Sequence, residues 1–296
     1  MQDRDRVDAT PAVTAIMTVY NGLPFVEEAV DSLLAQDFDD FELVVVDDGS
    51  TDGTAEALGR RTDPRMRLVR RPHQGRVAAL NHAVGLARGR YVANLDADDL
   101  ALPGRLSLPA RFLDEHPDVA MVASAVQPFV GEESGRRSRR LPSSDRAIRW
   151  SFLLHNPVFH SSATFRATSL AGVGGYDPAY SDALCDADLL LRLGRRHRLW
   201  NLDVPLAAKR LHYGQHFAAV DRRRRVRRHM ACRLRAAREF GFPLPLRPVA
   251  YAVAAVGAAR SMVVIGLAGY NGRVRRRRPR SGPSDSARSP RLTVRL

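Results

Sequence analysis

The chain has 296 residues and a formal net charge of +14, from 46 basic and 32 acidic residues. This length is enough for one large α/β domain with an appendage, or for two modest domains. Residues 222–296 hold 20 of the basic and 2 of the acidic residues, so they carry +18 while residues 1–221 carry −4. The net positive charge therefore lies in residues 222–296. The larger part of the chain lacks the basic charge that is typical of nucleic-acid-binding proteins.

The two cysteines, Cys185 and Cys232, are too few and too isolated for a disulfide framework or a thiolate metal site. Residues 1–6 are polar and of mixed charge, without the apolar core of a signal peptide behind them. We therefore expect a reducing compartment and a cytoplasmic protein. Lys209 is the only lysine, so part of the arginine excess reflects the composition of the source genome.

Short apolar runs alternate with amphipathic segments in the first hundred residues. The pattern predicts strands at 13–19, 42–46, 66–69 and 91–95, and helices at 24–36, 51–58 and 77–87. Such alternation is typical of a parallel, right-handed β/α sheet. Further strands are expected at 119–126 and 162–165 and a helix at 188–195, with a charged loop at 134–140. Because the alternation has ended there, we expect the second half to form the acceptor side of a site.

Two of the predicted strands end in carboxylates. Asp47 and Asp48 follow one strand, and Asp96 and Asp98 follow another some fifty residues later. The carboxyl ends of sheet strands are where open α/β folds bind their ligands. We therefore expect the two ends to lie side by side and to form a pocket for a nucleotide and a metal ion.

Three activities compete for such a fold: a dinucleotide-dependent oxidoreductase, a sugar nucleotidyltransferase and a glycosyltransferase. The first two require glycine-rich loops after the first strand. Here that strand runs into Tyr20, Asn21 and Gly22, which match neither loop. An aromatic ring and an amide suit a flat base with a polar edge, which favours the third activity.

An ordered set of motifs between Val13 and Gln215 resembles the inverting glycosyltransferases of family 2, which have the GT-A fold. The motifs are Thr18-Val19-Tyr20-Asn21-Gly22, Gln36-Asp37-Phe38, Phe41 to Thr54, Ala79-Leu80-Asn81, Ala87-Arg88-Gly89, and Leu95-Asp96-Ala97-Asp98-Asp99 followed by Leu102-Pro103. The fold class implied is α/β, with a mostly parallel central sheet flanked by helices and a helical, basic C-terminal extension.

The resemblance assigns roles to residues of the first half. Tyr20 and Asp48 would hold the nucleoside, with Thr18 nearby; the competing interpretation is that Asp48 caps the helix that follows it. Asp96 and Asp98 match the Asp-x-Asp motif that meets the ribose and a divalent metal ion, Mn²⁺ or Mg²⁺. A hard cation that bridges two phosphates needs one or two carboxylates, which this motif supplies.

The catalytic base is implied further along the chain. Cys185-Asp186 resembles the Glu-Asp pair that opens a helix in the family, where the Asp deprotonates the acceptor hydroxyl, so Asp186 is the expected base. The Cys185 thiol replaces the usual Glu, and Asp188 is the rival, more typical of a first-turn helix residue. His212-Tyr213-Gly214-Gln215 resembles the family's His-x-x-Gln, which makes His212 a candidate metal ligand. His160-Ser161-Ser162 resembles a segment that lines the acceptor side.

The tail predicts a helix from Asp221 to Phe240, stopped by Gly241, and an apolar segment at 248–270 between arginine clusters. The segment is long enough to span a bilayer. Arg260 at its centre and arginines on both sides oppose a single span. An interfacial helix or a shallow hairpin on an anionic membrane surface fits better. A solvated extension and nucleic-acid binding are the other two readings, and the last is the least favoured.

The resemblance, together with these residues, implies a metal-dependent inverting hexosyltransferase that moves a sugar from a nucleotide-diphosphate donor to a glycan or lipid-linked acceptor in bacterial surface polysaccharide or glycolipid assembly. The expected domains are a GT-A domain at 11–220, a basic helical extension at 221–280 and a disordered tail at 281–296. The enzyme would be cytoplasmic, or peripheral at the inner face of the cell membrane. The alternative is a catalytically silent scaffold, for which Cys185 is the only hint.

Overall fold

The structure is a computed structural model, and it describes residues 10–131, 133–134, 141–180, 184–212 and 222–274. The strands are β1 (Val13–Val19), β2 (Phe41–Asp47), β3 (Met66–Arg70), β4 (Tyr91–Asn94), β5 (Leu100–Ala101), β6 (Val119–Val130), β7 (Glu133–Ser134), β8 (Thr164–Arg166) and β9 (Arg198–Arg210). The helices are α1 (Val26–Leu34), α2 (Thr54–Gly59), α3 (Arg76–Leu86), α4 (Ser107–Glu115), α5 (Asp145–Phe152), α6 (Ala167–Gly172), α7 (Cys185–Gly194), α8 (Arg222–Glu239) and α9 (Arg247–Val274).

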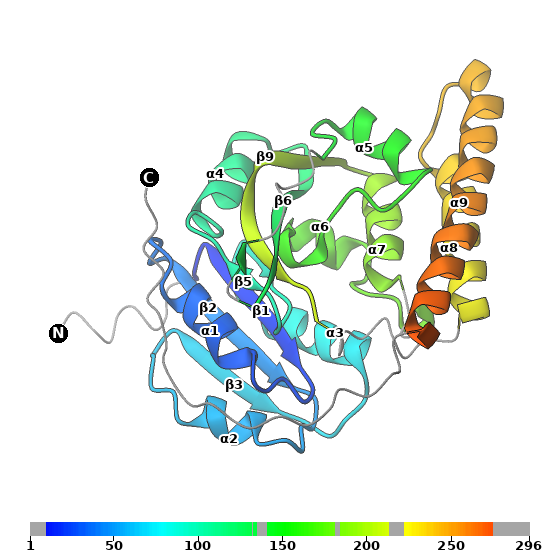
Figure 1. Cartoon of the computed structure of the whole chain (residues 1–296). Coiled ribbons are helices and arrows are strands. Elements are labelled where there is room, and N and C mark those ends of the chain that lie inside the picture. The colour runs from blue at the N-terminus through cyan, green and yellow to red at the C-terminus, as the bar shows by residue number, and fades with distance from the viewer. Residues whose placement is uncertain (1–9, 132, 135–140, 181–183, 213–221, 275–296) are drawn as a thin grey trace.

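The strands form one twisted sheet in the order β3-β2-β1-β4-β8-β6-β9-β5, with β7 on β6 (Figure 1). Strands β3, β2, β1 and β4 are parallel, as predicted. The second half differs, because β8 runs antiparallel to both β4 and β6, and β5 runs antiparallel to β9. The sheet is therefore mixed. Also contrary to expectation, β2 and β4 are not neighbours, since β1 lies between them.

Both faces of the sheet are covered, so successive residues of the central strands enter two different cores. Val44 and Val46 of β2 pack on the face covered by α3 and α7, whereas Leu43 and Val45 pack on the face covered by α1 and α4. This explains why β2 is apolar at every position between Leu43 and Val46, the pattern of a strand buried on both faces.

The basic extension shares the core of the sheet. Ala236 of α8, Phe240 just after it and Ala254 of α9 belong to the same apolar cluster as residues of α7 and β6. Helix α9 approaches very closely, because a Cβ atom on Gly257 would lie 2.1 Å from the Leu153 carbonyl oxygen. The predicted helix ending before Gly241 is present as α8, and Asp221, its expected cap, lies outside the described residues.

The apolar segment at 248–270 is a single helix within α9, so the expectation of a shallow hairpin is wrong. In the part of the chain that the structure describes, no helix combines the length and hydropathy that a bilayer crossing requires. The charged segment at 135–140, Gln215 and the tail at 281–296 also lie outside the described residues.

Candidate active site

The loops after β1, β2 and β3 meet at one end of the sheet. Asp48, after β2, is almost completely buried, and its carboxylate accepts hydrogen bonds from the backbone of Gln74 (3.2 Å) and Gly75 (2.7 Å). Its oxygens also lie 3.3 Å from Arg71 Nε and 2.9 Å from His73 Nδ1. Asp48 therefore fixes the loop that leads into α3 and does not cap α2. The N-cap of α2 is Gly53, without a side-chain cap, and the nearby Asp52 accepts hydrogen bonds from the backbone and hydroxyl of Thr54.

Tyr20 projects from the end of β1 beside this loop. Its side chain is 48 % exposed, and its ring lies 4.1 Å from the ring of His73 at an interplanar angle of 32°. Asn21 ties the tyrosine loop to the β2 loop, because its side chain accepts a hydrogen bond from the Thr51 backbone at 2.8 Å. The exposed face of the aromatic pair is a platform of the kind on which a nucleobase stacks. Thr18 lies two residues before Tyr20, in β1, and is part-buried.

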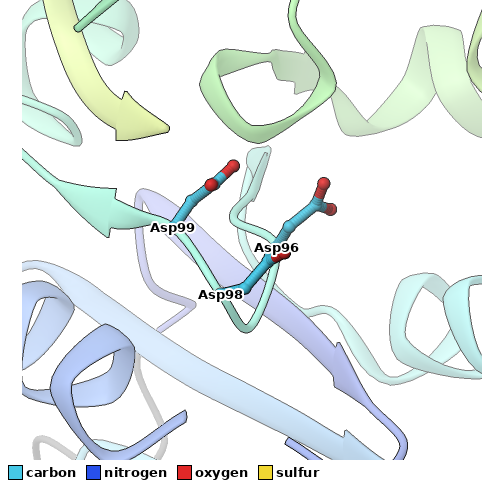
Figure 2. A group of neighbouring side chains, drawn as sticks. All are labelled: Asp96, Asp98 and Asp99. Atoms are coloured by element: carbon cyan, nitrogen blue, oxygen red, sulfur yellow. The ribbon is translucent and has the colours of Figure 1, made fainter. Parts of the chain in front are cut away.

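Three aspartates, Asp96, Asp98 and Asp99, follow β4 and precede β5 on a single turn (Figure 2). One carboxylate oxygen from each lies within 4.8 Å of the others. Asp98 is the most open of the three, and its Oδ2 lies 2.9 Å from His212 Nε2. The cluster thus brings together the two predicted motif aspartates, a third that the motif adjoins, and His212 from beyond β9.

Positive charge holds Asp96 ionised. Burial opposes its ionisation, but Arg76, whose Nη2 lies 2.7 Å away, and then His160 outweigh burial and hold the pKa of Asp96 well below its ordinary value. His160 is itself fixed between the amide of Asn94 (2.9 Å) and the hydroxyl of Tyr176 (2.7 Å). This arrangement keeps the first motif aspartate charged and oriented at neutral pH.

Asp99 has the opposite character. It is fully buried, and burial together with its neighbours Asp96 and Asp98 raises its pKa to about 6, although Lys209 opposes the shift. Its carboxylate accepts hydrogen bonds from Ser161 and from the backbone of Arg210 (3.0 Å). Crowded carboxylates of this kind are stabilised by a cation, and oxygen-rich groups are the ligands that Mg²⁺ and Mn²⁺ prefer. The residues present therefore fit a divalent metal ion.

A cavity of about 290 Å³ lies beside the acidic turn. Its polar lining comes from α3, the acidic turn, the 156–161 segment, the start of α7 and β9. The lining residues include Arg76, Asp96, Asp99, Asn156, His160, Ser161, Asp186 and Lys209, with apolar Val126, Val158, Phe159 and Leu184. The cavity unites residues from both halves of the chain, and it contains the expected base together with the first aspartate of the motif.

Asp186 and Asp188 lie two residues apart in the first turn of α7 but have different surroundings. Asp186 is part-buried, and the neutral amide of Asn156 donates to it at 2.8 Å. Asp188 is buried between two arginines, Arg192 at 2.7 Å and Arg235 of α8 at 2.5 Å. The two guanidinium groups therefore engage both carboxylate oxygens of Asp188. Asp186 is the one of the two that lines the cavity.

Comparisons with known proteins agree with this geometry. A sequence profile described as glycosyl transferase family 2 matches residues 14–171, which is more than half of the chain. The chain belongs to glycosyltransferase family 2. It is 33 % identical over 193 residues to EpsE of Bacillus subtilis, covering 63 % of this chain and 68 % of EpsE. It is 35 % identical over 162 residues to the succinoglycan biosynthesis protein ExoO of Rhizobium meliloti, covering 54 % of this chain and 45 % of ExoO.

Solved structures show the same GT-A fold. TarS of S. aureus, in complex with UDP-GlcNAc, superposes with a TM-score of 0.64 at 19 % identity, covering 81 % of this chain and 70 % of TarS. The mannosyltransferase PcManGT of Pyrobaculum calidifontis, in complex with GDP-Man and Mn²⁺, gives a TM-score of 0.57 at 23 % identity, covering 90 % and 81 %. The match covers only about half of the length of ExoO and of a glycosyltransferase from Haemophilus influenzae.

Several residues of this glycosyltransferase site were not predicted. Arg76, His73, Asn156 and Lys209 each contact or face an expected site residue, from an element distant in sequence. The predicted motif at Asn81 has a structural role, because its amide exchanges hydrogen bonds with the backbone of Tyr176 at 2.8 Å in both directions. Of these, only His73 and Arg76 carried a usable signal, since they lie two residues before and one residue after Gly75, which precedes α3.

Proposed function

We propose that this family 2 glycosyltransferase is a metal-dependent, inverting hexosyltransferase that uses a nucleotide-diphospho-sugar donor. The observation that supports this most is that Asp96 of the acidic turn and Asp186 of α7 line the same cavity. TarS in complex with UDP-GlcNAc and PcManGT in complex with GDP-Man and Mn²⁺ have the same fold, which supports a donor and a metal of these classes.

In this proposal the nucleobase stacks on the Tyr20 and His73 platform, with Asp48 and Thr18 beside it and Asp96 toward the ribose. Asp98 would hold the divalent ion, with Asp96 and His212 as the further ligands. The ion would neutralise negative charge that develops on the leaving diphosphate.

The transfer step follows from the position of Asp186. The acceptor hydroxyl oxygen forms a bond to the anomeric carbon while the bond from that carbon to the diphosphate oxygen breaks. Asp186 takes the hydroxyl proton, and the nucleoside diphosphate leaves with the electron pair of the broken bond. Attack from the side opposite the leaving group inverts the anomeric centre. Asn156 keeps the Asp186 carboxylate oriented without neutralising it.

Calorimetry tests the metal and donor assignments together. We expect a UDP-sugar or a GDP-sugar to bind the wild-type protein in the presence of Mn²⁺. The same nucleotide sugar should bind much more weakly when Mn²⁺ is absent. Asp98→Asn should abolish this metal dependence, whereas Glu115→Gln on the surface of α4 should not change it. Metal-independent binding by the wild-type protein, or equal affinity of Asp98→Asn, would remove Asp98 from a metal site.

The biological setting is also a proposal. ExoO is named for succinoglycan biosynthesis, and another relative is named hyaluronan synthase. We propose a glycan or lipid-linked acceptor in the assembly of a bacterial polysaccharide or glycolipid, and a GT-A domain at 11–220 followed by an extension at 221–280. A silent scaffold, the alternative, would bind no donor and hydrolyse none, so donor hydrolysis by purified protein separates the two.

The exposed face of α9 supports peripheral contact with an anionic membrane at its cytoplasmic face. Val249 and Val256 on one face of α9 are 50 % and 63 % exposed, and Leu244 just before the helix is 73 % exposed. Arg247 at the start of the helix and Arg260 are also exposed. Exposed apolar residues near basic residues are typical of interfacial helices. Opposite this face of α9, Ala250 and Ala254 are buried against the core.

Liposome co-sedimentation of full-length variants tests this contact. Truncation at residue 220 would remove Phe240 and Ala254 from the core, so point changes are preferable. Val256→Asp should reduce binding to anionic vesicles, and binding of the wild-type protein should weaken with salt. Val130→Asp, on an exposed position of β6, is the control. Equal binding of all proteins, or equal binding to neutral vesicles, would contradict the proposal.

A further inference from the structure

Lys209 is the one cation of the cavity whose identity stands out from the composition. The chain has 46 basic residues, and 45 of them are arginine. The single lysine lies near the end of β9 and lines the same cavity as Asp96 and Asp186. A chain that uses arginine at every other basic position has an ammonium group here.

The contacts of Lys209 leave donor capacity facing the cavity. Its Nζ lies 3.4 Å from Asp99 Oδ2, and this is its one hydrogen-bond partner among the described residues. An ammonium group has three N–H donors. The side chain remains 31 % exposed, while Asp99 is 0 % exposed and also accepts from Ser161 and the Arg210 backbone. Asp99 thus anchors Lys209, and the other N–H donors of the ammonium group are available to the cavity that Lys209 lines.

The position of the cavity indicates which part of a donor reaches Lys209. Tyr20 and Asp48, the proposed nucleoside residues, do not line it. Of the three proposed metal ligands only Asp96 lines it, so the cavity adjoins the metal site and extends away from the nucleoside residues. Asp186, the proposed base, also lines it. About 290 Å³ is also at the lower end of the range for small-molecule sites, so the cavity fits a sugar ring better than a whole nucleotide sugar.

We propose that Lys209 is a donor-specificity residue, whose ammonium group, anchored on Asp99, donates a hydrogen bond to an oxygen of the transferred sugar. This inference rests on the proposed function of the same site. The compact ammonium suits a ring oxygen substituent in a confined space, whereas a planar guanidinium is larger and donates in a fixed fork. The ligand class is therefore a hexose whose hydroxyl or other oxygen substituent faces β9.

The test compares nucleotide sugars with the corresponding free nucleotides. Calorimetry with Mn²⁺ would use UDP, UDP-glucose, UDP-N-acetylglucosamine, UDP-glucuronate, GDP and GDP-mannose. We expect Lys209→Met to weaken binding of the preferred nucleotide sugar about 10- to 100-fold, as for loss of a hydrogen bond to a charged group. Binding of the free nucleotide should change far less. Arg198→Met, at the opposite, exposed end of β9, is the matched control.

A second variant guards against a folding defect. Lys209→Arg keeps the charge beside Asp99, so it should keep the thermal stability and the affinity for free nucleotide while altering the ranking of the sugars. The inference is overturned if Lys209→Met weakens free nucleotides and nucleotide sugars equally, or if neither variant changes the difference between them. Absence of any nucleotide binding by the wild-type protein would instead contradict the proposed function.

Discussion

The donor-side half of the molecule, residues 10–106, and the acceptor-side half, residues 107–260, position their carboxylates by different means. On the donor side each functional acid follows a parallel strand, so Asp48 and Asp96 stand at the same edge of the sheet. On the acceptor side Asp186 stands on α7, and its amide partner Asn156 comes from a loop thirty residues earlier. In the first half the ends of regular strands position the carboxylates. In the second half, contacts between elements that are distant in sequence position them.

The two halves also differ in how they treat charge. Asp48 is paired with Arg71 and Asp96 with Arg76, so the donor side meets its ligand with carboxylates that are already compensated. In the other half, Arg192 of α7 and Arg235 of α8 form ion pairs with Asp188. Asp186, which faces the cavity, has the neutral amide of Asn156 as its partner. An acid that accepts a proton from a substrate needs such an environment, because a bound guanidinium would disfavour protonation. The comparison predicts that substitution of Asp186 lowers the rate of transfer and that substitution of Asp188 lowers stability, although both residues lie in one helical turn.

Asp186→Asn should produce the largest functional loss. Removal of a general base lowers the rate of transfer by about 10²–10⁴, equivalent to about 3–5 kcal/mol in the barrier. Donor binding and thermal stability should persist, because Asn156 can still hydrogen-bond to the new amide. Steady-state transfer, calorimetry and thermal unfolding measured on the same preparation check this. Near-normal transfer would break the comparison and move the base elsewhere in the cavity.

Asp188→Asn should have the reverse effect. It leaves Arg192 and Arg235 facing a neutral group in a buried site, and loss of one partner from a buried ion pair costs about 3–5 kcal/mol. We expect a large fall in the urea midpoint, with transfer by the folded fraction affected less than in Asp186→Asn. Arg198→Met, which removes an exposed pair with Asp118, is the control for a surface change. Unchanged stability would show that α8 does not anchor α7.

The sequence predicted the donor side well because its signals are local. β1 was predicted at its observed bounds, and β2, β3, β4, α1 and α3 within about two residues at each end. The acceptor side was predicted in part. β9 was not located, because Asp203 and Pro205 interrupt its apolar pattern where register shifts bend it against β6. α5, with few apolar residues and an N-cap at Ser144, was also missed.

The candidate site shows the same division. Residues implied by the family motifs, such as Asp96 and Asp186, line one cavity. The residues that contact them and the adjoining Asp99 were not predicted, because Arg76, Asn156 and Lys209 reach the site from other elements, 20 to 110 residues away along the chain. A motif specifies the group that acts on the ligand. The groups that set its charge and orientation follow only from the tertiary fold.

Arg105 offers a smaller test, of the junction between the two halves. It is buried, and it donates to the carbonyls of Asn94 (2.7 Å) and Ala163 (2.9 Å) and to the Thr164 hydroxyl (2.8 Å). Burial lowers its pKa to about 9, so it stays cationic at neutral pH. Arg105→Leu would remove these hydrogen bonds from a buried site, although the Ala163 carbonyl still accepts from the Asn94 backbone, and should cost about 3 kcal/mol. Chemical denaturation measures this, and exposed Arg111→Leu should cost well under 1 kcal/mol.

The smallest effect is expected at the far end of the donor-side strands, at Glu42. Its carboxylate accepts from Thr14 at 2.7 Å and pairs with half-exposed Arg88 at 2.8 Å. Burial opposes ionisation, but the Arg88 and Thr14 hydrogen bonds prevail and lower the pKa of Glu42 below its ordinary value of 4.5.

Because the folded-state pKa of Glu42 is depressed, its contribution to stability is complete above about pH 4.5 and is lost as the pH falls below that value. Glu42→Gln should therefore cost about 1 kcal/mol at neutral pH and make the loss of stability between neutral and acidic pH shallower than in the wild-type protein. Transfer activity should be unchanged, since Glu42 lies at the opposite end of β2 from Asp48. Urea unfolding at several pH values, with Glu115→Gln as the exposed control, measures the effect. If the two variants gave the same pH dependence, the ion pair would contribute nothing, and if Glu42→Gln impaired transfer, the donor-side strands would couple to the site along their length.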